Sequence, residues 1–364
     1  MNHRIAICEP VCQGFEHGPV NTAIIVTALR AYPDASLIFL GKESHLEAVR
    51  HLLSKSHPEA VPRAEWRKSA GAATGSNVLT AIRRDLPWCR SLVETAEAAS
   101  ADLLLVCTAM DSGLLALKRV LARPPTGPPV LAFIHGILAT IEAAESTKWW
   151  RKLVNLRLVL GLKHPAQLRN IALGSSIHAY LQTVAPQFAS QFRPFEHPYL
   201  WAVDTVPPPR EEGPVSFGFF GVNSVNKGFG RFHALARDAR DKGLETRFVM
   251  AGFVRQSEDC IKYGGAVEGV SNTPLSREEF SARAQRVDYA LWTGEPRHYN
   301  LTASATFLDA LCYVRPGIYL RNRYIEYYFN QMDDIGYLCD SYEEILRLRL
   351  ADPTVPTLFD LVQT

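Results

Sequence analysis

The feature of this sequence that most constrains its fold is an alternation of short apolar runs with amphipathic stretches, interrupted once by prolines. Continuous apolar runs are typical of parallel strands buried on both faces, and amphipathic stretches between them are typical of crossover helices. We expect strands at Arg4–Cys8, Ser36–Leu40, Asp102–Cys107, Val130–Ile134 and Asn170–Leu173, and then at Val215–Gly221, Thr246–Ala251, Asp288–Trp292 and Gly317–Leu320. The pattern predicts an α/β protein with two parallel sheets flanked by helices.

Helices are expected between these strands, and several of them begin with recognisable capping residues. The predicted helices are Asn21–Arg30, Ser44–Leu53, Gly113–Arg123, Trp149–Leu162, Phe229–Lys242, Ser276–Arg286, Ala303–Tyr313 and Tyr342–Leu350. Asn21 is available as an N-cap, and Ser44, Ser276 and Ser341 each precede a glutamate by three residues, which is the capping-box pattern. The polar segment Ser54–Ser76 is expected to be a loop.

A proline-rich stretch divides the chain. Residues 198–214 contain five prolines, three of them consecutive, which excludes a helix or a central strand. Because 364 residues suit two domains, we predict an N-terminal domain at 1–197, a linker at 198–214 and a C-terminal domain at 215–364.

Composition excludes several classes of protein. Hydrophobic residues make up 47% and charged residues 21%, as in an ordinary folded domain, and the net charge of +2 speaks against binding nucleic acid mainly through phosphate contacts. The seven cysteines show no Cys-x-x-Cys pair or metal-ligand spacing, so we expect reduced structural thiols and no metal site. No signal peptide or membrane-spanning run is found in the sequence, so we expect a cytoplasmic protein.

Two loops of the second half stand where ligands bind in α/β sheets, beyond the carboxyl ends of strands. The loop after Val215–Gly221 contains Asn223 and Lys227, but Asn226 and Gly228 depart from the residues that a P-loop requires. No Gly-x-Gly-x-x-Gly follows a predicted strand either, which excludes the dinucleotide fingerprint.

The loop after Asp288–Trp292 leads into a helix that we expect to begin near Thr302. The amides of Thr302, Ala303 and Ser304 would then form an anion site. Tyr299 and Asn300 would line the approach to it. Asp309 could accept hydrogen bonds from a ribose, although a solvated helix charge is the alternative.

The second half resembles the nucleotide-sugar glycosyltransferases of the GT-B fold. FFGVNSVNKGF, VEGVSNTPLSREEFSARAQRVDYALW and YNLTASATFLDALCYVRPGIYL are similar to donor-binding segments of the retaining family-four enzymes. The resemblance implies two Rossmann-like domains facing across a cleft, with Lys227 as a phosphate ligand and Val270 near the nucleobase. Val222 stands where that family has an arginine, and Leu301 and Asp309 replace its two glutamates.

In the first half, the resemblance implies roles for two strand ends. His135 ends a strand where the family places a histidine that contacts the donor sugar. The loop from Glu9 to Asn21 would lie near the donor phosphates and the acceptor, with Gly14 and Gly18 among its binding residues. Glu16 or His17 could act as general base if the reaction inverts configuration, whereas the resemblance favours retention.

A basic segment around Trp149 and Trp150 suggests contact with an anionic membrane surface. Between Lys148 and Arg169 there are six Lys and Arg and no acidic residue. A core helix with basic ends is the alternative.

These features together predict a glycosyltransferase that moves a sugar from a nucleoside diphosphate donor to an acceptor hydroxyl, of a glycan or lipid-linked saccharide. The sequence has no Asp-x-Asp motif, so we expect no divalent cation and no other cofactor. The alternatives are a sugar transferase that modifies DNA or protein and a catalytically inactive nucleotide-sugar-binding protein.

Overall fold

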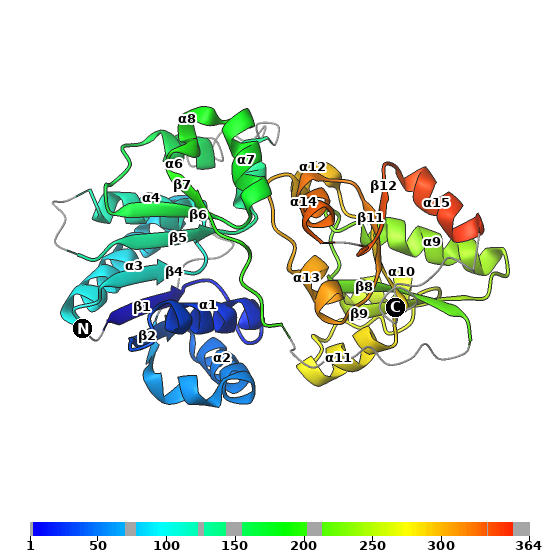
Figure 1. The fold of residues 1–364 in the computed structure, drawn as a ribbon, viewed down its shortest axis with the longest axis horizontal. Helices are drawn as coiled ribbons and strands as arrows, with labels where there is room; N and C mark the ends of the chain where they lie inside the picture. The colour runs from blue at the N-terminus through cyan, green and yellow to red at the C-terminus, as the bar shows by residue number, and fades with distance from the viewer. Residues whose placement is uncertain are drawn as a thin grey trace. The chain divides into compact units, whose positions relative to one another are not determined.

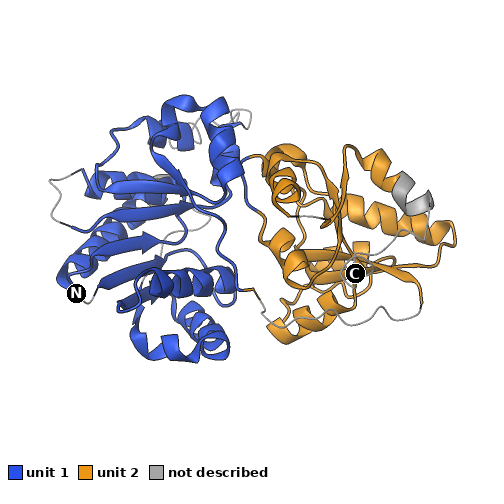
Figure 2. Cartoon of the chain, viewed as in Figure 1, with its two compact units in different colours: residues 1–200, 301–303 blue, residues 201–300, 304–364 orange. Residues whose placement is uncertain are grey.

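The chain divides into two units, which Figure 2 shows in different colours. Unit 1 comprises Met1–Leu200 and Leu301–Ala303, and unit 2 comprises Trp201–Asn300 and Ser304–Thr364. The structure is a computed structural model that describes residues 3–69, 78–122, 127–142, 155–201, 213–332 and 334–351. The division falls inside the proline-rich stretch, but the grouping of residues 301–303 with unit 1 differs from the continuous second domain expected from the sequence.

Unit 1 is built on a seven-stranded parallel sheet in the order β3-β2-β1-β4-β5-β6-β7 (Figure 1). Its strands are β1 (Arg4–Glu9), β2 (Ser36–Gly41), β3 (Ala64–Lys68), β4 (Leu103–Val106), β5 (Val130–Ile134), β6 (Leu168–Ala172) and β7 (Phe192–Pro194). The apolar side chains of β1 and β2 are buried with those of the helices that follow them, in one core that includes Ile7, Ile25 and Val49. The five strands expected in this half are confirmed.

The helices of unit 1 are α1 (Gly18–Ala31), α2 (Glu43–Ser56), α3 (Val78–Ala98), α4 (Asp111–Val120), α6 (Leu156–Gly161), α7 (Ser175–Val184) and α8 (Pro186–Ala189), with 3₁₀ helices η1 (Pro58–Arg63) and η2 (Ile137–Ile141). Three expectations were wrong. Helix α1 starts before Asn21, α2 is preceded by Lys42 without a side-chain cap, and the expected loop at Ser54–Ser76 contains η1 and β3.

Unit 2 is built on a five-stranded parallel sheet in the order β12-β11-β10-β8-β9. Its strands are β8 (Val215–Val222), β9 (Thr246–Phe253), β10 (Tyr289–Trp292), β11 (Gly317–Leu320) and β12 (Gly336–Cys339). Because side chains alternate between the faces of a strand, Phe219 of β8 packs in the core with α9, whereas Phe220 packs in a second core with α11 and α13. The sheet is therefore covered on both faces.

The helices of unit 2 are α9 (Phe229–Asp241), α10 (Ser257–Tyr263), α11 (Arg277–Gln285), α12 (Pro296–Tyr299), α13 (Ala305–Cys312), α14 (Arg323–Gln331) and α15 (Tyr342–Ala351). The capping box of Ser276 and Glu279 is confirmed. At α15 the hydroxyl of Ser341 accepts a hydrogen bond from the amide of Glu344, but the Glu344 carboxylate accepts from Asp340 instead of closing a box.

Candidate functional site

Each sheet has one point at which the chain reverses its direction of winding, and this point is where α/β sheets bind ligands. In unit 1 the reversal lies between β1 and β4, and in unit 2 it lies between β8 and β10. The loops that leave these strands at their carboxyl ends diverge there.

Lys227 lies in the loop between β8 and α9, at the reversal point of unit 2. Its side chain lines a pocket together with Thr306, Trp292 and Tyr319. Burial lowers the pKa of the ammonium to about 8, with Asp309 opposing the shift and Arg255 adding to it. Across the described part of the chain, no hydrogen bond or ion pair satisfies Nζ. A desolvated cation in this state binds an anion favourably.

The loop that carries Lys227 is fixed to the loop after β10. The amide of Glu295 donates to the carbonyl of Asn226 (2.8 Å), and the hydroxyl of Thr293 donates to the carbonyl of Gly228 (2.8 Å). Gly228 has φ +76°, and a Cβ there would lie 2.0 Å from the carbonyl oxygen of Thr293. Gly228 therefore has a structural reason, since it allows the two loops to meet.

Helix α13 does not begin near Thr302, as we expected from the sequence. Its N-cap is Ser304, whose hydroxyl accepts a hydrogen bond from the amide of Phe307 and also contacts the hydroxyl of Thr306 (3.1 Å). Thr302 and Ala303 belong to unit 1, where the Thr302 hydroxyl donates to the carbonyl of Gly136 (3.4 Å). The proposed row of three amides is therefore wrong, and only Ser304 lies at a helix start.

The other residues predicted for unit 2 have different surroundings. Tyr299 is 3% exposed and its ring packs edge-on against Trp292 (centroids 4.3 Å apart), so it belongs to the core and does not line an approach. Asn300 accepts a hydrogen bond from the amide of Arg323 (3.3 Å). Val270 follows Gly269, in a segment that extends the edge of the sheet beside β9.

Asp309 is already engaged by cations of the protein. Its carboxylate lies 3.5 Å from the guanidinium of Arg277, and its charge also opposes the lowering of the Lys227 pKa. The Arg277 guanidinium stacks on Phe280 and Tyr313, which fixes its position. The carboxylate thus compensates protein charge, in addition to any role in holding a ribose.

In unit 1, the reversal point is organised around the buried carboxylate of Glu9. One oxygen accepts hydrogen bonds from the amides of Val11 and Cys12, and the other accepts from the Asn21 amide and the Thr108 hydroxyl. Glu9 is fully buried. Four donors to one carboxylate fix the first turn of the β1–α1 loop to the end of β4.

His45 continues this network to the predicted glycine. Its Nε2 lies 2.8 Å from the Asn21 side-chain nitrogen, and its Nδ1 lies 2.8 Å from the carbonyl of Gly14. These partners require a neutral ring that donates through Nδ1 and accepts through Nε2. Burial lowers the pKa of His45, in agreement with that state. Gly14 itself has φ +50°, a conformation that favours glycine.

Two predicted histidines of unit 1 lie together. The rings of His17 and His135 have centroids 4.8 Å apart, and both Nδ1 of His17 and Nε2 of His135 are buried without a hydrogen-bond partner in the described chain. Burial holds the pKa of His135 well below its usual range, and His17 and His197 add to this effect. The pKa of His197, whose ring faces His135 edge-on, is lowered to about 4 by burial.

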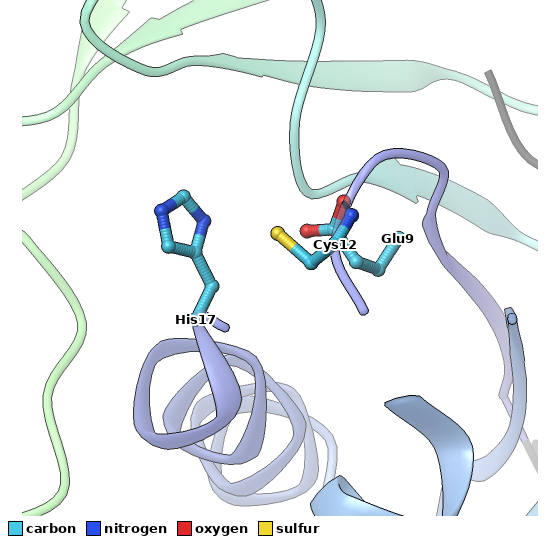
Figure 3. A group of neighbouring side chains, drawn as sticks. All are labelled: Glu9, Cys12 and His17. Atoms are coloured by element: carbon cyan, nitrogen blue, oxygen red, sulfur yellow. Dashed lines mark hydrogen bonds between the residues drawn. The ribbon is translucent and has the colours of Figure 1, made fainter. Parts of the chain in front are cut away.

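The geometry separates the two candidates for general base. Glu16 is exposed, and its carboxylate accepts a hydrogen bond from the amide of Gln13 (3.2 Å). His17 has φ +51° as the N-cap of α1, an uncommon conformation for a residue with a side chain, and its ring lies near Cys12 (Figure 3). Gly18, the first residue of α1, packs closely against Leu52.

Sequence reasoning missed Asp111, the first residue of α4. One of its carboxylate oxygens is buried without a partner in the described residues, and burial raises its pKa to about 6. The available signal was an acidic residue in the short segment between an apolar strand and the helix that follows it.

Glu9, Cys12 and His17 each have a potential ligand atom within 4.8 Å of the others (Figure 3). The carboxylate oxygens of Glu9 are already occupied by four donors, and burial raises the pKa of the Cys12 thiol. This chemistry fits a hydrogen-bonded network better than a metal site, which needs a thiolate and a free carboxylate.

The predicted membrane contact through Trp149 and Trp150 lies outside the described residues. No helix in the described part of the chain has the length and apolar character needed to span a bilayer.

Comparison with solved structures shows similarity along almost the whole chain. Anabaena Alr3699/HepE in complex with UDP and glucose is 15% identical, with a TM-score of 0.61 over 95% of this chain and 89% of that chain. The catalytic domain of Arabidopsis thaliana starch synthase IV, bound to ADP and acarbose, is 12% identical, with a TM-score of 0.55 over 98% and 87%. The fold is GT-B. The GT-B fold also agrees with the two parallel sheets described above.

A GT-B fold alone does not determine an activity. The N-terminal domain of Candida albicans trehalose-6-phosphate phosphatase is 9% identical to this chain, with a TM-score of 0.63 over 100% of this chain and 91% of that chain. The sequence matches no protein-family model and no curated protein. Function must therefore be argued from the residues at the two reversal points.

Proposed function

We propose that this chain is a glycosyltransferase that transfers a sugar from a nucleoside diphosphate donor to a hydroxyl of a glycan or lipid-linked saccharide. The observation that carries the proposal is the ammonium of Lys227, which is desolvated and unpaired in the described chain at the reversal point of the unit 2 sheet. Two structures of similar fold hold nucleoside diphosphates, UDP in one and ADP in the other.

The chemistry of the leaving group explains the need for this cation. When the glycosidic bond breaks, negative charge develops on the diphosphate, and a preorganised positive charge lowers the energy of that transition state. The start of α13 is close to Lys227, because Thr306 and Lys227 line the same pocket. Its free amides would add a smaller stabilisation to that of the ammonium.

Unit 1 would supply the groups that contact the sugar and the acceptor. The ring of His135 is neutral, and its buried, unpartnered Nε2 can accept a hydrogen bond from a sugar hydroxyl. If the reaction inverts configuration, the candidates for the general base are His17, whose Nδ1 has no hydrogen-bond partner among the described residues, and the exposed Glu16.

The proposal is tested by calorimetric titration of the protein with UDP, ADP, GDP and dTDP. The substitution Lys227→Ala should weaken the binding of the preferred nucleotide by about 1.5–3 kcal/mol, because a hydrogen bond to a charged group is lost. Lys242→Ala is the matched control, since Lys242 pairs with Asp238 at the far end of α9. Unchanged affinity in a folded Lys227→Ala protein would contradict the proposal.

Transfer is tested separately from binding. The wild-type protein is incubated with labelled nucleotide sugars, and release of the nucleoside diphosphate is measured with and without saccharide acceptors. Turnover that Lys227→Ala abolishes supports the enzyme. Tight binding with no hydrolysis or transfer for any donor would favour the inactive nucleotide-sugar-binding protein.

A further inference from the structure

The carboxylates around Lys227 are each engaged by another group of unit 2. Asp259 accepts a hydrogen bond from the Asn223 amide (2.9 Å), Glu295 lies 3.6 Å from the Arg231 guanidinium, and Asp309 pairs with Arg277. Within the described residues, none of these three carboxylates forms an ion pair with Lys227. The carboxyl edge of β8 and β9 is therefore positive.

A second cation, Arg255, lies at this edge. It follows β9 by two residues, and its amide donates to the Asn223 side-chain oxygen (3.0 Å), which fixes its backbone beside the end of β8. Its side chain is exposed, and no ion pair or side-chain hydrogen bond to a described residue satisfies its guanidinium. Asn223, which we expected to bind the nucleotide, holds this loop through its side chain.

The ammonium of Lys227 lies at the same carboxyl edge of β8 and β9 as Arg255. It lies 3.2 Å from the position that a Cβ of Gly221 would occupy, and Gly221 pairs with Gly252 across β8 and β9. Lys227 thus folds back over the end of β8, next to the strand that leads to Arg255. The charge of Arg255 is one of the causes that lower the pKa of Lys227, so the two groups are close enough to repel each other.

We propose that Arg255 and Lys227 together bind the two phosphate groups of the donor, and that Arg255 makes the site selective for nucleoside diphosphates over nucleoside monophosphates. This inference rests on the function proposed above, and it states how many phosphate groups the site recognises in its substrate. Two adjacent cations without a carboxylate between them repel each other, and an anion with two phosphates relieves that repulsion.

Lysine and arginine would contact phosphate in different ways at this site. Lys227 is a desolvated point charge in a pocket, whereas Arg255 is an exposed planar fork that can bind a phosphate through two hydrogen bonds. The loop after β8 contains no arginine, and the last residue of that strand is Val222. The neighbouring loop supplies the second charge.

The test compares UDP with UMP, and ADP with AMP, by calorimetry on the full chain. Arg255→Ala should weaken diphosphate binding about 10- to 100-fold, the range for a lost charged hydrogen bond, and change monophosphate binding less than about threefold. Arg237→Ala is the control, because Arg237 is also exposed and lies on α9 of the same unit. It should leave both affinities unchanged.

A relocated charge separates a direct role from a structural one. In the register of β8 and β9, Val222 pairs with Phe253. Phe253 precedes Arg255 by two residues, so an arginine at position 222 would start beside the same strand end. The double substitution Val222→Arg with Arg255→Ala should recover at least tenfold of the lost diphosphate affinity if a guanidinium at this edge is what matters.

The outcomes are distinct. If wild-type protein binds diphosphates and Arg255→Ala binds them equally well, the role of Arg255 is wrong while the proposed function stands. If Arg255→Ala weakens binding but the relocated arginine restores nothing, Arg255 acts by shaping the loop, and the direct contact is overturned. If the wild-type protein binds no nucleoside diphosphate, the proposed function fails and this inference fails with it.

Discussion

At the residue scale, the ionisation of Lys227 makes nucleotide binding sensitive to pH. Burial lowers its pKa to about 8, and a bound diphosphate would raise the pKa again, so binding takes up a proton above pH 8. Affinity should therefore fall about fourfold between about pH 7 and pH 8.5. The measurement is calorimetry with UDP or ADP in buffers of different ionisation enthalpy, which also counts the protons.

Lys227→Arg is the control for this pH effect. A guanidinium stays protonated throughout the range, so the affinity of this variant should be nearly independent of pH. An equally steep pH dependence in Lys227→Arg would show that another group titrates on binding.

The single residues also show how far the sequence could be used. His135 follows β5 directly, and His17 and Lys227 lie in the loops after β1 and β8, as expected, because an apolar run followed by glycine or a polar residue marks the end of a strand. The surroundings of Tyr299 and Asp309 could not be foreseen. Their partners, Trp292 and Arg277, come from other elements, and only the folded chain brings them together.

At the scale of elements, Ser304 has a structural role that the sequence alone did not reveal. It is 4% exposed and caps α13 through the amide of Phe307. Ser304→Ala should lower the free energy of unfolding by about 1 kcal/mol, as other lost N-caps do, and Ser304→Asp should restore most of it. Urea unfolding followed by circular dichroism measures the difference.

Because Ser304 is buried, a bulky substitution at this position would test the stability of α13 as well as nucleotide binding. A leucine there would remove the cap and overfill a buried position, so loss of activity in Ser304→Leu would not by itself locate the nucleotide. If Ser304→Ala unfolds at the same urea concentration as the wild type, the cap contributes nothing to stability and α13 is held by its packing alone.

Helices and strands were predicted well where burial gives the sequence a continuous apolar run or an apolar stripe along one face. β11 was predicted with the bounds that it has, because it is a central strand of four apolar or small residues. β3 was missed because it is an edge strand with the sequence AEWRK, in which charged residues alternate with apolar ones. The start of α13 was misplaced because Thr302 and Ser304 are both good N-caps, and only tertiary contacts choose between them.

At the scale of the whole molecule, one architecture serves two chemical environments. Each unit has a parallel sheet with a single reversal point. In unit 1 that point is formed by a saturated carboxylate and neutral histidines, and in unit 2 it is formed by cations without an ion-pair partner among the described residues. The contrast suits unit 2 to an anionic group and unit 1 to hydroxyls, and it could not be deduced from a net charge of +2.

This contrast predicts where a nucleotide without its sugar will protect the chain from hydrogen exchange. At a concentration of UDP or ADP 100 times its dissociation constant, amides whose exchange requires release of the ligand should exchange about 100-fold more slowly. We expect this protection at residues 221–228 and 252–259 and at the start of α13. The β1–α1 loop, at residues 10–17, should change much less.

The Lys227→Ala protein at the same nucleotide concentration is the control for this experiment, because it keeps every other residue of both units. Its protection should be at least about tenfold smaller than that of the wild type, since its affinity is expected to be at least tenfold lower. Strong protection of the β1–α1 loop without protection of residues 221–228 would place the nucleotide in unit 1. In that case the division of roles drawn here from the charges of the two sheets would be wrong.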